Sequence, residues 1–178
     1  MAKILAFAGS NSSTSINYEL VRFTTSLVEN HDVQLINMVN LPFPMYSEDY
    51  EKKNGYSNSL IELKNDIGNA NGIILSVNEH NGNPSAFFKN VFDWLSRIER
   101  DFLKNTKVLL MATSPGRGGG KNSLKIVNEI LPRFGAEVVE SFSLPSFSHN
   151  FDIAKGGITD PELSKSHKIS VQNFLASL

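Results

Sequence analysis

The stretch AKILAFAGSNSSTSIN, residues 2–17, places an apolar run directly before a loop of hydroxyl and amide side chains. A continuous apolar run such as Ile4–Ala8 is typical of a strand buried on both faces of a parallel sheet. Gly9 ends the run, and we expect a helix to begin near Ser15. Because the first N–H groups of a helix carry partial positive charge and bind anions, the stretch predicts a phosphate site. Serines also cap helices, but five hydroxyls within residues 10–15 exceed what a cap needs.

The rest of the chain alternates apolar runs with helical periods, which indicates βαβ units and a parallel sheet. Strands are predicted at residues 4–8, 32–37, 72–77, 107–112 and 137–142, and helices at residues 17–29, 59–69, 84–98, 121–134 and 160–174. Because strands and helices alternate without a linker, the sequence predicts one domain with an α/β fold over residues 1–178. Its class is the flavodoxin-like three-layer α/β/α sandwich, with a five-stranded parallel sheet in the order 2-1-3-4-5. Ligands of such sheets bind at the carboxyl ends of the strands, so the loops that begin at Gly9, Asn78 and Ser114 are expected to converge.

The segment Leu41–Asn58, with Pro42, Pro44 and Gly55, is predicted to be a long loop. Its aromatic residues are Phe43, Tyr46, Tyr50 and Tyr56. They are equally compatible with the wall of a site and with packing on the surface or on another subunit.

Composition narrows the classes of function. A net charge of −1 over 178 residues gives no basic field for nucleic acid. The absence of cysteine excludes disulfides, thiolate catalysis and cysteine-ligated metals. No apolar run approaches the length of a membrane span and the chain enters a strand without a leader, so we expect a cytoplasmic protein without a membrane partner. His31, His149 and His167 lack the spacing of metal ligands, and no metal site is predicted.

Two familiar phosphate motifs do not match. The first loop has Asn11 and Thr14 where the second and third glycines of G-x-G-x-x-G belong. The run Gly118–Lys121 differs from a Walker A loop, because Pro115 stands at the first glycine and Asn122 at the magnesium-binding hydroxyl. These glycines are interpreted either as a flexible turn or as bare backbone that lets a flat ligand approach.

Three segments together resemble the NADPH-dependent FMN reductase family, which includes quinone, chromate and azo-dye reductases. Residues 9–17 are similar to its G-S-x-R-x-x-S-x-N phosphate loop, with Ser12 at the position of the arginine. Residues 78–82 and 89–97 are similar to its P-E-Y-N/H and L-K-N-x-x-D-W-L-S-R segments, with Asn78 for the proline and His80 for the tyrosine. Residues 113–119 are similar to its glycine-bearing loop.

The resemblance implies a set of FMN-binding residues and no catalytic acid or base. The phosphate would be held by Ser10, Ser12, Ser15, Ile16 and Asn17, and the ribityl chain or ring bordered by Met45, Tyr46 and Ser47. The ring edge would meet Asn78, Glu79, His80 and Asn81, and its pyrimidine side Ser114 and Gly116. Arg117 is a candidate for the additional phosphate of NADPH, or a solvated loop residue. Lys89, Asp93 and Trp94 are expected to serve packing, a salt bridge or a subunit interface.

The implied activity is an oxidoreductase that uses FMN as cofactor and NADPH or NADH as co-substrate. Electrons pass through bound FMN to a small-molecule electron acceptor: a quinone, an azo compound, chromate or free flavin. The alternative is an electron-carrier flavodoxin without NAD(P)H activity, although a net charge of −1 gives little of the acidic steering that such carriers use. A flavin-free regulatory or scaffold protein on the same fold is a further alternative. The resemblance also implies a homodimer or homotetramer, with residues 41–56 and 88–97 as the suspected surfaces.

Overall fold

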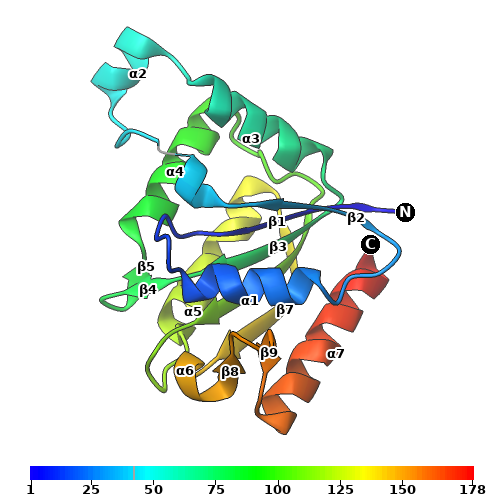
Figure 1. The fold of residues 1–178 in the computed structure, drawn as a ribbon. Helices are drawn as coiled ribbons and strands as arrows, with labels where there is room; N and C mark the ends of the chain where they lie inside the picture. The colour runs from blue at the N-terminus through cyan, green and yellow to red at the C-terminus, as the bar shows by residue number, and fades with distance from the viewer. Residues whose placement is uncertain (42) are drawn as a thin grey trace.

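A parallel sheet of five strands forms the centre of the structure, a computed structural model that describes residues 1–41 and 43–178. The strands are β1 (Lys3–Ala8), β2 (Asp32–Ile36), β3 (Gly72–Val77), β6 (Lys107–Thr113) and β7 (Glu137–Leu144). They lie in the order β2-β1-β3-β6-β7, with every neighbouring pair parallel. Since these are the first to fifth predicted strands, the order 2-1-3-4-5 is confirmed (Figure 1).

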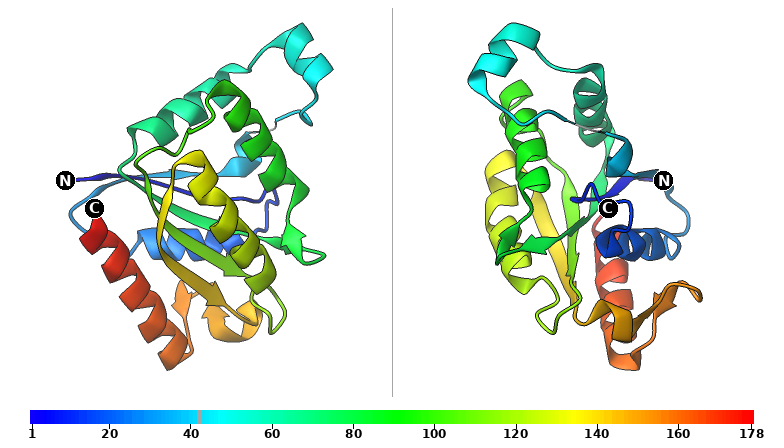
Figure 2. Two further views of the ribbon diagram at one scale, coloured as in Figure 1. Left: turned by 180° about the vertical axis from the view of Figure 1, so that it is seen from behind. Right: turned by 60° about the vertical axis from the view of Figure 1, so that its left-hand side comes forward.

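Helices cover both faces of the sheet and make the three layers (Figure 2). One face carries α1 (Ile16–Thr25) and α7 (Pro161–Ser177), and the other carries α3 (Asn58–Asn69), α4 (Ala86–Ile98) and α5 (Lys121–Ile130). The strand β3 is buried along its whole length, which explains its unbroken apolar run.

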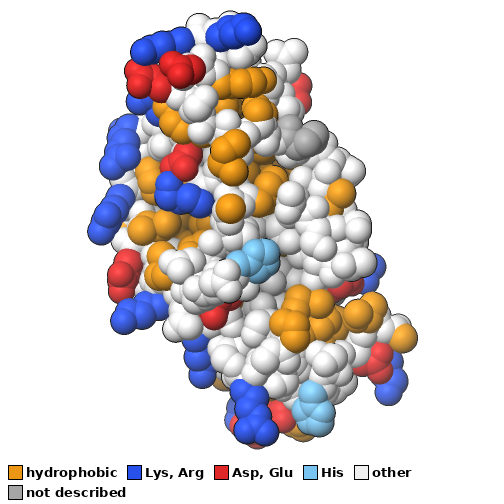
Figure 3. Space-filling view, turned by 90° about the vertical axis from the view of Figure 1, so that its left-hand side faces the viewer, with side chains coloured by type: hydrophobic (Ala, Val, Ile, Leu, Met, Phe, Trp, Pro, Cys, Tyr) orange, Lys and Arg blue, Asp and Glu red, His pale blue; other side chains and the backbone are white. Residues whose placement is uncertain are grey.

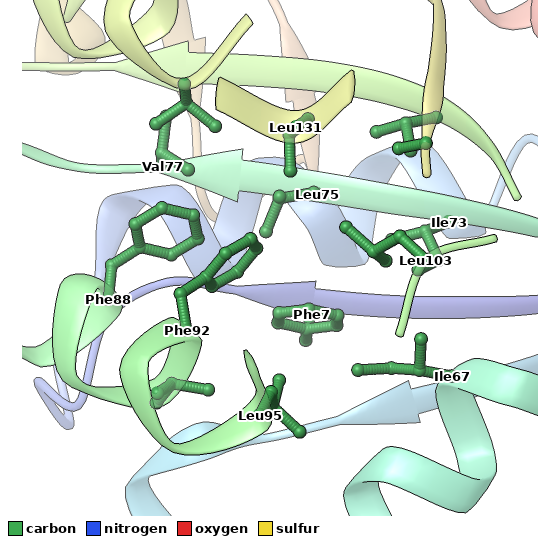
Figure 4. Close-up of a cluster of buried hydrophobic side chains, with 14 of the residues drawn as sticks. Phe7, Ile67, Ile73, Leu75, Val77, Phe88, Phe92, Leu95, Leu103 and Leu131 are labelled. Atoms are coloured by element: carbon green, nitrogen blue, oxygen red, sulfur yellow. The ribbon is translucent and has the colours of Figure 1, made fainter. Parts of the chain in front are cut away.

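The two faces enclose separate apolar clusters, because each helix buries one stripe of side chains. On the α4 side, Phe88 and Phe92 pack beside Phe7 and Leu75 of the sheet (Figure 4). On the opposite side, Leu20 of α1 and Phe174 of α7 pack against strand residues that include Ala6. Ala6 and Phe7, which are adjacent in β1, thus pack into different clusters, and β1 is held between the two helical layers.

The prediction of an uninterrupted loop over residues 41–58 was wrong, because the segment contains the helix α2 (Glu48–Asn54). The helix buries no side chain and therefore has no apolar period. Its signal is electrostatic: Ser47 caps it, acidic residues fill the first turn and lysines the last. Pro42, which belonged to the predicted loop, lies outside the described residues.

Several short elements also differ from the prediction. The loop after β3 is a hairpin of β4 (Glu79–His80) and β5 (Asn83–Pro84), so Pro84 precedes α4 and Ser85 is its cap. Three-residue and four-residue 3-10 turns, η1 (Met38–Asn40) and η2 (Leu131–Phe134), follow β2 and α5. Beyond β7 the chain forms α6 (Phe147–Asn150) and a second hairpin, β8 (Phe151–Asp152) with β9 (Gly157–Ile158). None of the helices within residues 1–41 and 43–178 combines the length and apolar character that a membrane crossing needs.

Candidate functional site

The loops that follow β1, β3 and β6 meet at the carboxyl edge of the sheet and enclose a pocket of about 180 Å³. The first loop and the start of α1 contribute Ser10, Ser12, Thr14, Ser15, Ile16 and Asn17 to its lining. The second and third loops contribute Asn78, Glu79, His80, Thr113, Ser114 and Pro115. The expected convergence of three polar loops is therefore present in the structure.

The start of α1 faces this pocket with backbone donors available. Ser15 is the cap, and its Oγ accepts from the Tyr18 N–H at 3.2 Å. Within the part of the chain that the structure describes, the N–H groups of Ile16 and Asn17 have no acceptor. The preceding loop is folded on itself, since Ser12 N–H donates to Ser10 Oγ and Thr14 N–H donates to Ser12 Oγ. A helix N-terminus with two donors and a surrounding of hydroxyls is suited to an anion.

Asn17 ties the pocket floor together through its side chain. Its Oδ1 accepts from Ser76 Oγ at 2.8 Å and from Thr113 N–H at 3.0 Å, while its Nδ2 donates to the Thr113 carbonyl at 3.2 Å. The residue is 3% exposed. The side-chain amide thereby joins α1 to β3 and β6, while the backbone N–H of Asn17 has no acceptor among the described residues.

Gly9 is needed where β1 leaves the sheet, because α4 passes directly above it. A Cβ at this position would lie 2.6 Å from Phe88 Cδ2. Ser85 Oγ donates to the Gly9 carbonyl at 3.1 Å and accepts from the Phe88 N–H at 3.2 Å. The first loop is thus anchored on α4 as well as on the sheet.

The hairpin after β3 forms the second wall. The Glu79 carboxylate accepts from the backbone N–H groups of Asn122 and Ser123, at 2.9 and 3.1 Å, and so caps α5. His80 is exposed, and its Nε2 lies 3.4 Å from Asn78 Nδ2. Asn78 lines the pocket, and its Oδ1 atom is buried without a donor among the described residues, which is uncommon for a buried acceptor.

Two of the glycines after β6, Gly119 and Gly120, have an internal packing role. Gly119 and Gly120 have φ angles of 61° and 76°, which favour glycine. A Cβ on Gly119 would lie 2.4 Å from Ser143 Oγ, and one on Gly120 would lie 2.9 Å from the Ala112 Cβ. Bare backbone is therefore required here by the protein's own chain. Ser114 lines the pocket, whereas Gly116, Arg117 and Asn81 do not appear in its lining.

Met45, Tyr46 and Ser47 lie on a segment that we call the arm, residues 43–57, and none of them lines the pocket. Ser47 caps α2, and the Tyr46 N–H donates to Asn90 Oδ1 of α4 at 2.7 Å. Trp94 Nε1 and Asn90 Nδ2 both donate to the Pro44 carbonyl, at 2.8 and 3.0 Å. Lys89 pairs with Asp93 at 2.5 Å on the same helix, so this helix segment serves packing and a salt bridge as expected.

Three pocket residues were absent from the predicted site: Thr14, Thr113 and Pro115. Thr14 belongs to the hydroxyl loop, and Thr113 and Pro115 flank Ser114, so their position at strand ends was the available signal. His167 of α7 is fully buried against α1 and does not line the pocket, with its Nε2 2.9 Å from Thr24 Oγ1. Burial, with a smaller contribution from the charge of Lys168, lowers the pKa of His167 to about 4. The residues that the structure describes contain no group of three or more His, Cys, Asp or Glu suited to a metal ion.

Comparison with known proteins gives consistent results. A quinone reductase of Escherichia coli is 29% identical over 96 residues, which cover 54% of this chain and 51% of that protein. The NADH-dependent flavin reductase subunit 2 of Lactobacillus johnsonii is 25% identical over 182 residues, covering 97% of this chain and 95% of the relative. The solved structure of FerB, a flavoenzyme NAD(P)H:(acceptor) oxidoreductase from Paracoccus denitrificans, has a TM-score of 0.76 at 20% identity. The match covers 99% of this chain and 98% of the FerB chain.

The structural likeness to FerB supports the flavodoxin-like fold. The family model described as NADPH-dependent FMN reductase matches residues 2–149, which include all three loops of the pocket. The chain therefore belongs to the NADPH-dependent FMN reductase family.

Proposed function

We propose that the protein is an FMN-dependent NAD(P)H oxidoreductase that delivers electrons to a small oxidised acceptor such as a quinone, an azo compound, chromate or free flavin. The observation that carries the proposal is the pocket itself. An open helix N-terminus and a hydroxyl loop lie at one end, and the buried, donorless Asn78 Oδ1 lies in the wall. The first feature fits a phosphate and the second fits a ring with N–H donors, so the residues present fit FMN.

In this proposal each loop has a separate task. Ser10, Ser12 and Ser15, with the N–H groups of Ile16 and Asn17, bind the phosphate. Asn78, His80 and Ser114 border the ring, with Asn81 and Gly116 at the outer rim. When bound, FMN supplies the two-electron chemistry. The buried side chain of Asn17 keeps the phosphate donors in fixed positions relative to β3 and β6, so little reorganisation is needed on binding.

The phosphate end of the pocket contains no lysine or arginine among its lining residues. Neutral hydroxyls, backbone donors and the helix dipole would therefore hold a dianion without an ion pair. Arg117 is exposed at the edge of the third loop and is proposed to meet the additional phosphate of NADPH. Comparison of the NADPH and NADH Michaelis constants of Arg117→Ala tests this role, which requires the NADPH constant alone to rise.

The decisive experiment is an anaerobic titration of the FMN-loaded protein with NADPH, followed through the visible flavin absorbance. Rapid, stoichiometric bleaching is expected. A spectrum that stayed yellow with NADPH and with NADH but bleached with dithionite would overturn the reductase and leave an electron carrier. Protein that bound no added FMN would overturn both.

We also propose that the protein is a homodimer or homotetramer that meets its partner copy through the arm, and that it acts in the cytoplasm. The arm exposes Met45 (69%), Tyr50 (40%) and Tyr56 (37%), and Figure 3 shows hydrophobic side chains gathered on this upper part of the molecule. Contiguous exposed apolar surface marks interaction sites. Sedimentation analysis of the wild type and of Met45→Glu tests the assembly, which is expected to weaken in the variant.

A further inference from the structure

Glu79 makes contacts that differ from those of a ring-edge residue. Its Oε2 accepts from Asn122 N–H and Ser123 N–H, and its Oε1 lies 3.3 Å from Asn122 Nδ2, which donates to it. The capped helix, α5, begins after Gly120, which provides no side-chain cap. The helices α1, α3, α4 and α7 instead have caps of their own: Ser15, Ser57, Ser85 and Asp160. Glu79 thus caps α5 from a distant loop of the same chain.

A second bond attaches the same two elements. Ser123 Oγ donates to the Asn78 carbonyl at 2.9 Å. Asn78 and Glu79 therefore both hold the hairpin after β3 against the first turn of α5. Because Asn78 carries the donorless Oδ1 in the pocket wall, the position of that oxygen depends on this attachment.

Glu79 is also one of the residues that line the pocket, so its carboxylate places a negative charge beside the pocket where it caps α5. Its hydrogen-bond partners among the described residues are amide N–H groups and not a lysine or an arginine. The helix dipole offsets only part of a full negative charge. A ligand that gains electron density in the pocket is consequently disfavoured relative to its oxidised form.

We propose that Glu79 is a positioning residue of the flavin site: it fixes the Asn78 wall on α5, and its charge lowers the reduction potential of bound FMN. This inference rests on the proposed function. It assigns Glu79 a role through α5 and through its charge, in place of direct contact with the ring edge.

Glu79→Gln tests the charge, because glutamine retains an acceptor oxygen for the two backbone donors. The measured quantity is the ratio of the dissociation constants of oxidised and reduced FMN, obtained from the reduction potential by dye equilibration. We expect this ratio to shift about tenfold in favour of reduced FMN, which corresponds to about 30 mV for a two-electron couple. An unchanged ratio would overturn the electrostatic role.

Asp160→Asn is the matched control, because Asp160 Oδ1 caps α7 by accepting from Leu163 N–H at 2.9 Å and does not line the pocket. It removes the same kind of capping charge, so we expect lower thermal stability and an unchanged FMN potential. An equal shift of the potential in this control would show a general effect of charge or stability and would overturn the assignment to Glu79.

Glu79→Ala tests positioning in the apoprotein by hydrogen exchange. The amides of residues 78–83 and 121–124 are expected to exchange about fivefold faster, as after loss of a helix cap, with the exchange of α7 unchanged. Unchanged exchange at the hairpin would overturn the positioning role. If the protein bound no FMN, the proposed function would fail and the potential effect with it, while the exchange comparison would still decide the positioning role.

Discussion

The pocket and the arm are each organised by a polar network around one side chain, but the networks differ in exposure. At the pocket, Asn17 makes three hydrogen bonds to Ser76 and Thr113 and is 3% exposed. On the arm, Glu51 accepts three, from Tyr46, Tyr56 and Arg97; its own side chain is 14% exposed and that of Arg97 is 51% exposed. The number of bonds is equal, so the two networks differ in their access to water and in the charge of the Glu51–Arg97 pair.

Water can replace the partners on the arm but not at the pocket floor. A buried donor or acceptor that loses its partner retains its full desolvation cost, whereas an exposed ion pair contributes little. We infer that the pocket is fixed before any ligand arrives, while the outer part of the arm around Glu51 can adjust its position and its Pro44–Tyr46 end stays bonded to Asn90 and Trp94 of α4. That division suits a cofactor site beside a surface that meets another molecule.

Asn17→Leu is expected to have the largest effect, because leucine keeps the approximate volume but leaves Ser76 Oγ and Thr113 N–H without their buried partner. The loss should be about 3–5 kcal/mol of unfolding free energy, measured by urea denaturation of the apoprotein. Asn54→Leu on the arm is the control; its Nδ2 donates to the exposed Tyr50 carbonyl, and the change should stay within about 0.5 kcal/mol. If both variants lost the same unfolding free energy, the proposed difference between the buried and the exposed network would be wrong.

The pH dependence of stability extends the comparison to the other end of α1. The pKa of His167 is lowered by burial from 6.5 to about 4, so the folded protein favours the neutral ring. Its contribution to stability is complete above pH 6.5 and is lost as the pH falls towards 4. It amounts to roughly 3 kcal/mol at about 1.4 kcal/mol per pKa unit.

His167→Phe should remove this loss, since phenylalanine can keep the contacts of the ring with Phe23 and Phe142. Urea denaturation at pH 7 and pH 4 is the measurement. The exposed His149→Phe should retain the wild-type difference between the two pH values. The prediction fails if His167→Phe loses as much stability as the wild type on acidification.

The sheet and the pocket were largely predictable from the sequence, because both depend on local signals. Apolar runs mark the strands, and glycine or hydroxyl residues at their carboxyl ends mark the loops that a parallel sheet gathers at one edge. The alternating helices then leave few strand orders for five strands. Ser15 shows the same locality: the residue predicted to start the helix is its cap.

The parts that were missed depend on contacts between distant segments or on helices without an apolar period. Glu79 is 43 residues from Asn122, and no local pattern links the two. The arm helix α2 buries no side chain, so hydrophobic periodicity could not find it. Met45–Ser47 follow from family resemblance alone, and their binding role stays a prediction, since the arm is attached to α4 away from the pocket lining.

Ser12→Arg tests the neutral phosphate end and should have a moderate effect. The family motif has arginine at this position, and a charge-assisted bond to phosphate is stronger than a neutral one. We expect about tenfold tighter FMN binding, or about 1.4 kcal/mol, measured by fluorescence titration at low salt. Riboflavin, which lacks the phosphate, should bind the variant and the wild type equally. A matching gain for riboflavin would place the new side chain against the ring instead of the phosphate.

Glu51→Gln should have the smallest effect and tests the exposed network. The hydrogen bond to Glu51 is the main cause of the raised pKa of Tyr56, and for Tyr46 it is second to burial. In both cases the folded protein favours the neutral phenol, so this contribution is present below pH 10 and is lost as the pH rises through the folded pKa. Ultraviolet titration of the variant should show part of the tyrosine absorbance change at lower pH than in the wild type. Tyr56→Phe should remove the Tyr56 component and leave that of Tyr46. Identical titration curves for wild type and Glu51→Gln would mean that Glu51 does not hold the arm in solution, and that contact between Trp94 and the surrounding tyrosine rings keeps it in place.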